Sequence, residues 1–276
     1  MTQQDLARAF RQLHAGGPLV LPNAWDAGSA RAVEAAGARA VATTSAGVSW
    51  ARGYRDGQHL PFAHAVDAVR AVARVVGVPV SADAEGGYGA GTPDDVAEAV
   101  GAFVDAGAVG VNLEDAPGRG GAALLSPDEQ AARIEAARRA AADRGVDAFV
   151  NARTDVYLAG AGDPDVWFDD VVRRAAVYVE AGADGVFVPA VADAETIGQL
   201  VSAVGAPLNV MVGPGALSVP ELAALGVARV SLGPSLALAA LGLVRRAARE
   251  ALAEGTYRAL GGAPTFADVD ALFAGG

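Results

Sequence analysis

The sequence predicts an α/β protein built as a (β/α)₈ barrel, the TIM-barrel fold. Short Val-rich runs alternate strictly with Ala-rich amphipathic segments. The Val-rich runs are almost continuously apolar, which is typical of strands buried on both faces in a parallel sheet. The chain has 276 residues, close to the ~250 of a typical barrel. Together these observations favour a barrel over a doubly wound sheet.

The elements follow from one joint that recurs along the chain: an Ala-rich segment, a Gly suited to end a helix, and then a Val-rich run. Near-copies of this joint span residues 34–45, 105–115, 180–190 and 224–234. The same rules predict eight strands, at Leu19–Pro22, Val41–Ser45, Val78–Asp83, Val109–Glu114, Ala148–Arg153, Gly185–Pro189, Pro207–Val212 and Arg229–Leu232. They predict eight helices, near residues 26–37, 61–76, 93–107, 127–144, 165–182, 193–204, 218–226 and 235–254. We expect residues 1–276 to form a single barrel domain.

The composition argues against several classes of protein. The formal net charge of -11 disfavours a nucleic-acid partner, because phosphate binding needs a basic surface. No run approaches the ~20 apolar residues of a membrane-spanning helix. Residues 1–17 contain no apolar core of a signal peptide. We therefore expect a cytoplasmic protein without a membrane partner.

The chain contains neither lysine nor cysteine. Without lysine it cannot form a Schiff base with a substrate or with pyridoxal phosphate. Without cysteine it has no thiolate nucleophile. The chemistry that remains is that of carboxylates, metal ions and arginine.

Charged residues follow three successive predicted strands, which end at Asp83, Glu114 and Arg153. Barrel active sites lie at the carboxyl ends of the strands. One acid in this position could simply cap the next helix or form a turn, but acids after two successive strands and an arginine after the next favour an active site. Other polar residues expected at the same end are Ser45, Glu85, Asp115, Asn151 and Asp155.

The converging acids indicate a metal site. Several carboxylates in one place repel each other unless a cation neutralises them. Oxygen ligands without cysteine or a nearby histidine select Mg²⁺, or Mn²⁺, over Zn²⁺. We therefore predict that Asp83, Glu85 and Glu114 hold a divalent cation, with some of them acting through water. Of the three histidines, His14, His59 and His64, only His59 stays a weaker candidate for the chemistry.

Arg153 is suited to bind a substrate carboxylate through two parallel hydrogen bonds. The alternative is an ion pair with Asp155 or Glu114, and both interactions can hold in the empty protein. Two glycine-rich segments, residues 86–91 and 117–121, follow the third and fourth strands. Neither fits a P-loop or a dinucleotide-binding motif, so close backbone approach to a ligand, or a lid, explains them better.

Four motifs together resemble the isocitrate lyase/phosphoenolpyruvate mutase superfamily: SAGVS at residues 45–49, DAEGGYG at 83–89, LED at 113–115 and NARTD at 151–155. The resemblance extends from PNAWDAGSA at residues 22–30 to SLGP at 231–234. The DAEGGYG segment is similar to the D-x-D-x-G-Y-G metal loop of that superfamily, with Glu85 in place of the second Asp.

The resemblance implies a role for each matching residue. Asp83, Glu85 and Glu114 would hold Mg²⁺, and Asp56 would join its water network. Ser45, Ala46 and Gly47 would bind the carboxylate and oxyanion of a 2-oxo acid, and Arg153 would contact the substrate. The implied catalytic residues are therefore Arg153, Ser45 and Asp56, and the predicted substrate-binding residues also include Trp25 and Asn209. The reaction theme of the superfamily is an enolate stabilised by Mg²⁺.

The resemblance also implies an assembly. Members of the superfamily exchange their last barrel helix between subunits. In this chain the exchanged part would be residues 235–276, the helix from Ser235 to Glu254 with the tail that follows. We therefore expect a homodimer or a homotetramer.

Departures from the superfamily motifs narrow the reaction. The K-[KR]-C-G-H motif of isocitrate and methylisocitrate lyases is replaced by APGRGGAALLS at residues 116–126. Ala190 stands where such lyases have an acid, and Arg119 is the only cation comparable to the lid lysine of phosphonate-cleaving members. We expect an Mg²⁺-dependent lyase, decarboxylase or hydrolase, most simply a carbon-carbon lyase, that acts on a small 2-oxo or 2-hydroxy (di)carboxylate. The alternatives are a 2-oxo acid binding barrel with little catalysis, and carbon-phosphorus cleavage of phosphonopyruvate.

Overall fold

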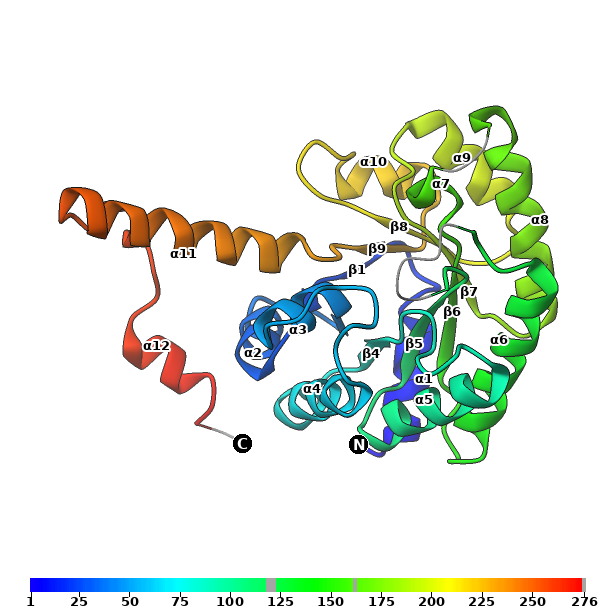
Figure 1. Ribbon diagram of the computed structural model, residues 1–276, viewed down its shortest axis with the longest axis horizontal. Helices are drawn as coiled ribbons and strands as arrows, with labels where there is room; N and C mark the ends of the chain where they lie inside the picture. The colour runs from blue at the N-terminus through cyan, green and yellow to red at the C-terminus, as the bar shows by residue number, and fades with distance from the viewer. Residues whose placement is uncertain (118–122, 161–162, 275–276) are drawn as a thin grey trace.

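The computed structural model describes residues 1–117, 123–160 and 163–274, and these form a parallel β-barrel surrounded by helices (Figure 1). The described strands form one sheet in the order β1-β9-β8-β7-β6-β5-β4-β3-β2, and every neighbouring pair is parallel. Their bounds are β1 Leu19–Leu21, β2 Asn23–Ala24, β3 Val41–Thr43, β4 Val80–Asp83, β5 Gly110–Glu114, β6 Phe149–Arg153, β7 Gly185–Val188, β8 Leu208–Met211 and β9 Arg229–Ser231. The predicted barrel class is confirmed.

The first predicted strand is broken at Pro22 into β1 and β2. Proline has no N–H to donate to a ladder, but the Pro22 carbonyl oxygen still accepts a hydrogen bond from the Ala42 N–H at 3.1 Å. β1 pairs with β9, and β2 pairs with β3. The two pieces therefore close the ring as one bent strand would, which turns the eight predicted strands into the nine described ones.

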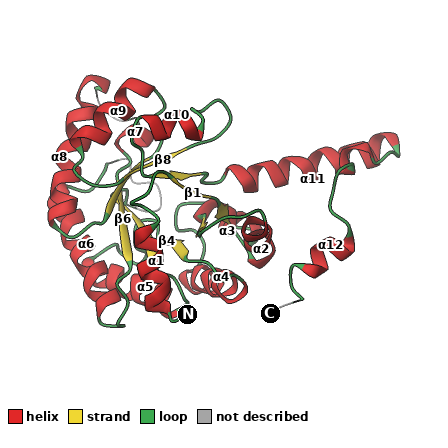
Figure 2. Cartoon of the chain, turned by 180° about the vertical axis from the view of Figure 1, so that it is seen from behind, coloured by secondary structure: helices red, strands yellow, loops and turns green. Residues whose placement is uncertain are grey.

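All eight predicted helices are present, as α2 Ala27–Ala35, α4 Phe62–Val75, α5 Pro93–Asp105, α6 Pro127–Ala142, α8 Trp167–Glu180, α9 Ala194–Ala203, α10 Val219–Ala224 and α11 Ser235–Glu254 (Figure 2). Several begin at a capping box, such as Thr92 with Asp95 and Ser126 with Glu129. The described residues contain four further α-helices that were not predicted: α1 Gln3–Gln12, α3 Ser45–Ala51, α7 Val156–Ala159 and α12 Phe266–Ala271. Ser45 was expected to end the second strand, but β3 ends at Thr43 and Ser45 begins α3.

Helix α1 lies against the amino-terminal ends of β5 and β6. The Gln3 side chain donates to the carbonyl oxygens of Val104 and Ala108, at 2.7 and 2.9 Å. His14 follows this helix and stacks on Phe149, with ring centroids 4.0 Å apart. Burial, and the charge of Arg229, lower the pKa of His14 to about 4. The imidazole is therefore neutral inside the folded barrel.

We expect the His14→Phe variant to lose part of the acid sensitivity of folding. In the unfolded chain the imidazole has an ordinary pKa of 6.5. Between pH 6.5 and 4 the unfolded state is therefore protonated at His14, whereas the folded state is not. Wild-type stability therefore falls as the pH drops from 6.5 toward 4. Urea unfolding at pH 7.5 and 5.5 should show the variant losing about 1 kcal/mol less than the wild type between these values. Equal losses in the two proteins would contradict this assignment.

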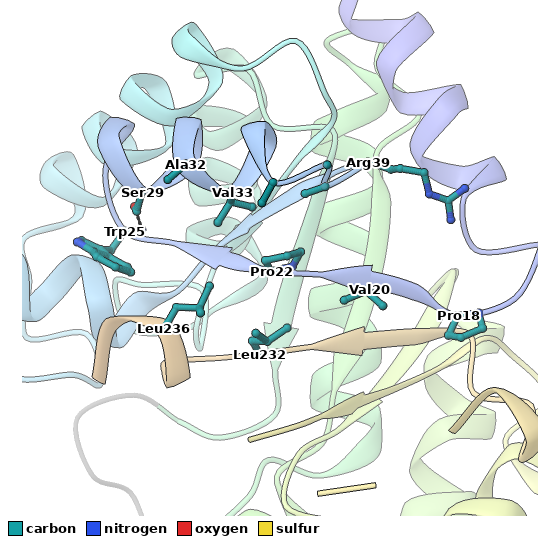
Figure 3. Close-up of a pocket in the computed structure, with 13 residues that line it drawn as sticks. Pro18, Val20, Pro22, Trp25, Ser29, Ala32, Val33, Arg39, Leu232 and Leu236 are labelled. Atoms are coloured by element: carbon teal, nitrogen blue, oxygen red, sulfur yellow. Dashed lines mark hydrogen bonds between the residues drawn. The ribbon is translucent and has the colours of Figure 1, made fainter. Parts of the chain in front are cut away.

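Helix α11 extends away from the barrel instead of packing on it (Figure 1). Ala237 is buried, whereas Leu238, Leu241, Val244 and Leu252 are exposed. An apolar groove of about 650 Å³ lies beside β1, at the place where the last helix of a closed barrel would pack (Figure 3). Its walls include Pro18, Val20, Pro22, Val33, Leu232 and Leu236. No helix in the described ranges is long and apolar enough to cross a membrane.

Candidate active site

The predicted site residues gather at the carboxyl ends of β4, β5 and β6. In the parallel ladder Glu114 is paired with Arg153, and Asp83 is paired with Asn112, two residues before Glu114. The pairing brings the side chains of Glu114 and Arg153 together, because paired residues on neighbouring strands point to the same face. The strand pattern alone therefore creates the acid and arginine cluster at this mouth.

Arg153 forms both of the ion pairs that the sequence left open. Its Nη1 lies 2.8 Å from Glu114 Oε2. Its Nε and Nη2 donate to the two carboxylate oxygens of Asp155, at 2.5 and 2.8 Å. The guanidinium also lies 5.7 Å from the centre of the Phe187 ring. Burial disfavours the charged form, but the carboxylates of Glu114 and Asp155 outweigh it and raise the pKa of Arg153 above its ordinary value.

Asp83 is held at one carboxylate oxygen and free at the other. Its Oδ2 accepts a hydrogen bond from the Ser45 N–H at 3.0 Å, and its own N–H donates to Thr43 Oγ1 at 2.9 Å. Its Oδ1 is buried and has no hydrogen-bond partner among the described residues. A buried carboxylate oxygen without a partner is costly unless a cation or water reaches it. Asp83 is therefore preorganised with one oxygen available to a ligand.

Glu85 is buried, and both of its carboxylate oxygens are occupied. Oε2 accepts from the Gln58 N–H at 2.7 Å, and Oε1 accepts from the Tyr88 hydroxyl at 3.0 Å. Glu85, Gln58 and Tyr88 have positive φ values of 49°, 62° and 60°, in a region that non-glycine residues rarely adopt and that clusters at functional sites. Burial, with the charges of Asp83 and Asp56, raises the pKa of Glu85 to about 7. Glu85 thus fastens the loop that carries Asp56 to the glycine-rich loop.

The site carries more negative charge than its own arginine can neutralise. Burial raises the pKa of Glu114, and Asp155, Asp83 and Glu85 add to the effect against the opposing charge of Arg153. Desolvation, and the charge of Asp83, raise the pKa of Asp56 on the exposed loop. Acids that raise each other's pKa in this way fit a site for a cation.

The three predicted metal ligands do not form a closed coordination shell by themselves. Across residues 1–117, 123–160 and 163–274, no three His, Cys, Asp or Glu side chains lie close enough to hold one metal ion directly. The donors still fit Mg²⁺, which keeps several of its water ligands and is bound through one or two carboxylates. The free Oδ1 of Asp83 is suited to direct contact, and Glu85 and Glu114 are suited to bind through water.

The predicted substrate-binding residues are distributed over three places. Ser45, Ala46 and Gly47 form the first turn of α3, the Ser45 N–H donates to Asp83 Oδ2, and the Ser45 side chain lies close enough to Asp56 to oppose the rise in the pKa of that carboxyl. A Cβ on Gly47 would lie 2.8 Å from the Thr44 side chain and 2.9 Å from that of Trp25, so only glycine fits there.

Trp25 packs against this turn at Gly47, and Asn209 lies inside the barrel. Trp25 lines the apolar groove beside β1 and is drawn there in Figure 3. Asn209 is buried inside the barrel, where it accepts a hydrogen bond from Asn151 at 3.0 Å. The first turn of α3 thus meets the acids through the Ser45 N–H and Asp83, and among the described residues no hydrogen bond joins Trp25 to the acids.

Sequence reasoning missed Arg133 and Tyr178, which support the site from behind, although it expected Asp115, the partner of Tyr178, at this end of the barrel. Arg133 on α6 donates to the carbonyl oxygens of Glu114, at 3.1 Å, and of Gly86, and so joins the loops after β4 and β5. Asp115 is fully buried and accepts from Tyr178 Oη at 2.7 Å and from the Asp155 N–H at 3.0 Å. The available signal was an arginine on the apolar face of a predicted helix. The predicted lid, residues 117–125 with Arg119, lies partly outside the described residues.

The amino-acid sequence matches a known protein family and is similar to individual proteins. The family model described as phosphoenolpyruvate phosphomutase matches residues 10–252. An uncharacterised protein of Mycobacterium tuberculosis is 40% identical over 227 residues, which cover 82% of this chain and 81% of that protein. The family-model match spans all the described strands and all four motifs.

Two solved structures are similar over nearly the whole chain. A putative lyase/mutase from Burkholderia cenocepacia J2315 has a TM-score of 0.91 and 41% identity, over 99% of this chain and 96% of that one. A phosphonopyruvate hydrolase, in complex with oxalate and Mg²⁺, has a TM-score of 0.83 and 27% identity, over 99% of this chain and 95% of that one. The barrel thus has counterparts of the same fold in both structures.

Proposed function

Because this chain belongs to the phosphoenolpyruvate phosphomutase family, we propose that it is an enzyme that uses Mg²⁺, or Mn²⁺, to cleave a bond in a small 2-oxo or 2-hydroxy (di)carboxylate. The observation that carries the proposal is the buried, unpartnered Oδ1 of Asp83 beside Glu85 and Glu114. Relatives of the family are lyases, mutases and hydrolases. Cleavage of a carbon-carbon bond is the reaction we favour.

Asp83 would contact the cation, with Glu85, Glu114 and Asp56 around it through water. When bound, the cation supplies Lewis-acid stabilisation to negative charge that develops on the oxygens of the substrate. Gln58 and Tyr88 hold the Glu85 carboxylate in place, so the arrangement of acids exists before the cation arrives. Preorganised charges of this kind avoid the cost of rearrangement during the reaction.

Arg153 would bind the substrate carboxylate. Asp155 holds one edge of the guanidinium through Nε and Nη2, which fixes its plane. The remaining donor edge carries Nη1, which contacts Glu114. A substrate carboxylate that replaces Glu114 at this edge would free Glu114 to turn toward the cation. The first turn of α3, with Ser45, Ala46 and Gly47, would contact the other end of the substrate.

A binding protein with little catalysis is the second candidate. Ala190, at the end of β7, stands where an acid was expected, and its φ of 68° is unusual for alanine. A site that holds the substrate but lacks this acid could bind without turnover. Carbon-phosphorus cleavage is the third candidate, supported by the similarity to phosphonopyruvate hydrolase.

The test is a panel of oxaloacetate, alkylmalates and phosphonopyruvate, assayed for release of pyruvate, oxalate, CO₂ and phosphate with Mg²⁺ and with EDTA. Metal-dependent release of pyruvate, oxalate or CO₂ supports the proposed carbon-carbon cleavage, and release of phosphate supports the third candidate. Calorimetry with oxalate in the presence of Mg²⁺ tests the second candidate, the binding protein, which requires micromolar binding without turnover. Absence of both binding and turnover would overturn all three.

We also propose that α11 of a second copy fills the apolar groove beside β1, so that the protein is a homodimer or a dimer of such dimers. The groove lies on the outside of the ring at the position of a last barrel helix, and the chain's own α11 leaves it uncovered. Exposed apolar residues on both elements support mutual burial. Residues 235–276 would then be the exchanged segment.

We expect Val244→Arg to dissociate the assembly. Val244 is 64% exposed on α11, and a charge there would be buried by a partner at a cost of several kcal/mol. Analytical ultracentrifugation should show a shift from oligomer to monomer at micromolar concentration. Leu158→Arg, at a 46% exposed site on α7, is the matched control and should leave the assembly unchanged. An assembly that withstands Val244→Arg would argue against the exchanged helix.

A further inference from the structure

A single arginine crosses the interior of the barrel beneath the acids. Arg229 belongs to β9, and its Nη2 donates to Asn112 Oδ1 on β5 at 3.1 Å. In the sheet order these two strands are separated by β8, β7 and β6, so the side chain spans the ring from one wall to the opposite one. Arg229 is only 1% exposed.

Arg229 is part of a polar layer directly below the candidate site. The Asn151 amide donates to Asn112 Oδ1 at 2.9 Å and to Asn209 Oδ1 at 3.0 Å. Asn112 and Asn151 each precede a site residue, Glu114 and Arg153, by two positions. Residues two apart on a strand point to the same face, so this layer forms the floor of the site. Asp83 is the ladder partner of Asn112, which places the guanidinium near the base of Asp83.

The guanidinium has no direct ion-pair partner in the part of the chain that the structure describes. Within the described ranges no carboxylate forms an ion pair with it, and its Nε and Nη1 have no hydrogen-bond partner. The neighbouring His14 does not compensate the charge of Arg229, because its imidazole is neutral and its Nδ1 faces the Phe10 carbonyl oxygen at 2.8 Å. Burial lowers the pKa of Arg229 to about 9, and Asp83 is the charge that opposes this shift. Arg229 is therefore cationic at neutral pH and balanced by the acids above it.

A buried cation without an ion pair costs several kcal/mol unless the surrounding field compensates it. The asparagines are neutral and offer only dipoles, and the Phe10 ring, whose centre lies 5.9 Å from the guanidinium carbon, adds a cation–π contact. The remaining compensation comes from the carboxylates of the site. In the low-dielectric interior, the same charge acts on whatever binds above it. It repels a divalent cation and attracts an anion.

We propose that Arg229 is a positioning residue whose buried charge sets the electrostatic balance of the site, weakening the binding of the divalent cation and strengthening that of the anionic substrate. This inference rests on the proposed function. It assigns the floor of the barrel a role in ligand binding in addition to packing. Arg229 acts through Asp83 and Asn112 and does not contact the substrate.

The experiment compares Arg229→Met, which removes the charge and keeps much of the volume, with Arg229→Lys, which keeps the charge. Calorimetry measures the Kd of Mn²⁺ and then the Kd of oxalate at saturating Mn²⁺, in the full-length protein. For Arg229→Met we expect Mn²⁺ to bind about tenfold more tightly and oxalate about tenfold more weakly. Arg229→Lys should remain within about threefold of the wild type for both.

Changes of opposite sign in the affinities for Mn²⁺ and oxalate distinguish an electrostatic effect from structural damage to the site. A merely structural role would weaken both ligands together, and that result, or no change in either, would overturn the inference. So would Arg229→Lys behaving like Arg229→Met. If Arg229→Met does not fold, the near-isosteric Asn112→Asp places a carboxylate on the guanidinium and must shift both affinities in the same two directions. Wild-type protein that fails to bind Mn²⁺ would overturn the proposed function itself, whereas normal wild-type binding with unshifted variants would sink this inference alone.

Discussion

Replacing Asp83 with asparagine is expected to abolish metal-dependent turnover, with kcat/KM falling at least about a thousandfold. Asp83 Oδ2 accepts from the Ser45 N–H, and Oδ1 is the unpartnered atom. An amide would keep its oxygen toward Ser45 and turn its NH₂ group to the position of the cation. The substitution therefore replaces the one free anionic ligand with a donor while leaving the volume unchanged.

Two measurements separate this effect from a loss of folding. The Kd of Mn²⁺ from calorimetry should rise at least about a hundredfold in Asp83→Asn, and the thermal unfolding temperature without metal should change little, because the relief of repulsion among the acids offsets the loss of the charge that faces Arg229. Asp143→Asn, at the exposed end of α6, is the control and should leave turnover and Mn²⁺ binding unchanged. Asp83→Asn protein that retains wild-type Mn²⁺ affinity would exclude Asp83 as a ligand.

The fold was predictable because a barrel follows from local rules repeated along the chain. Apolar runs and glycine helix ends predicted the eight helices and every strand position from β3 to β9. The break at Pro22 was not anticipated, since it depends on the two different neighbours of β1 and β2. Helix α11 has the apolar pattern of a packed helix, so its departure from the barrel could be expected only from the family resemblance.

The candidate site was predictable to the extent that it follows from strand register. Glu114, Arg153 and Asp155 come together because neighbouring strands end there, and Arg153 forms both of the ion pairs that were left open as an alternative to substrate binding. The supports of the site come from remote segments: Gln58 reaches Glu85 from a separate loop, and Arg133 reaches Gly86 from α6. Such contacts depend on how helices dock on the barrel, and no spacing in the sequence encodes them.

The variant Arg153→Met is expected to lose substrate binding and, without metal, much of its stability. Arg153 is 17% exposed at its side chain and pairs with two carboxylates that are 13% and 8% exposed. Removing one partner of a buried ion pair leaves the other charges uncompensated and typically costs about 3–5 kcal/mol. In Arg153→Met the uncompensated charges are those of Glu114 and Asp155, so a bound divalent cation should restore part of the lost stability.

The expected results are a fall in kcat/KM of at least about a hundredfold and a thermal unfolding temperature that rises more with added Mg²⁺ in Arg153→Met than in the wild type. Arg153→Lys should keep most of the stability but not the affinity for a carboxylate, since an ammonium group cannot make two parallel hydrogen bonds. Arg139→Met, on the exposed face of α6, controls for the loss of an arginine. If Arg153→Met binds oxalate as the wild type does, the arginine has a structural role only, and the substrate carboxylate must be bound by the first turn of α3 alone.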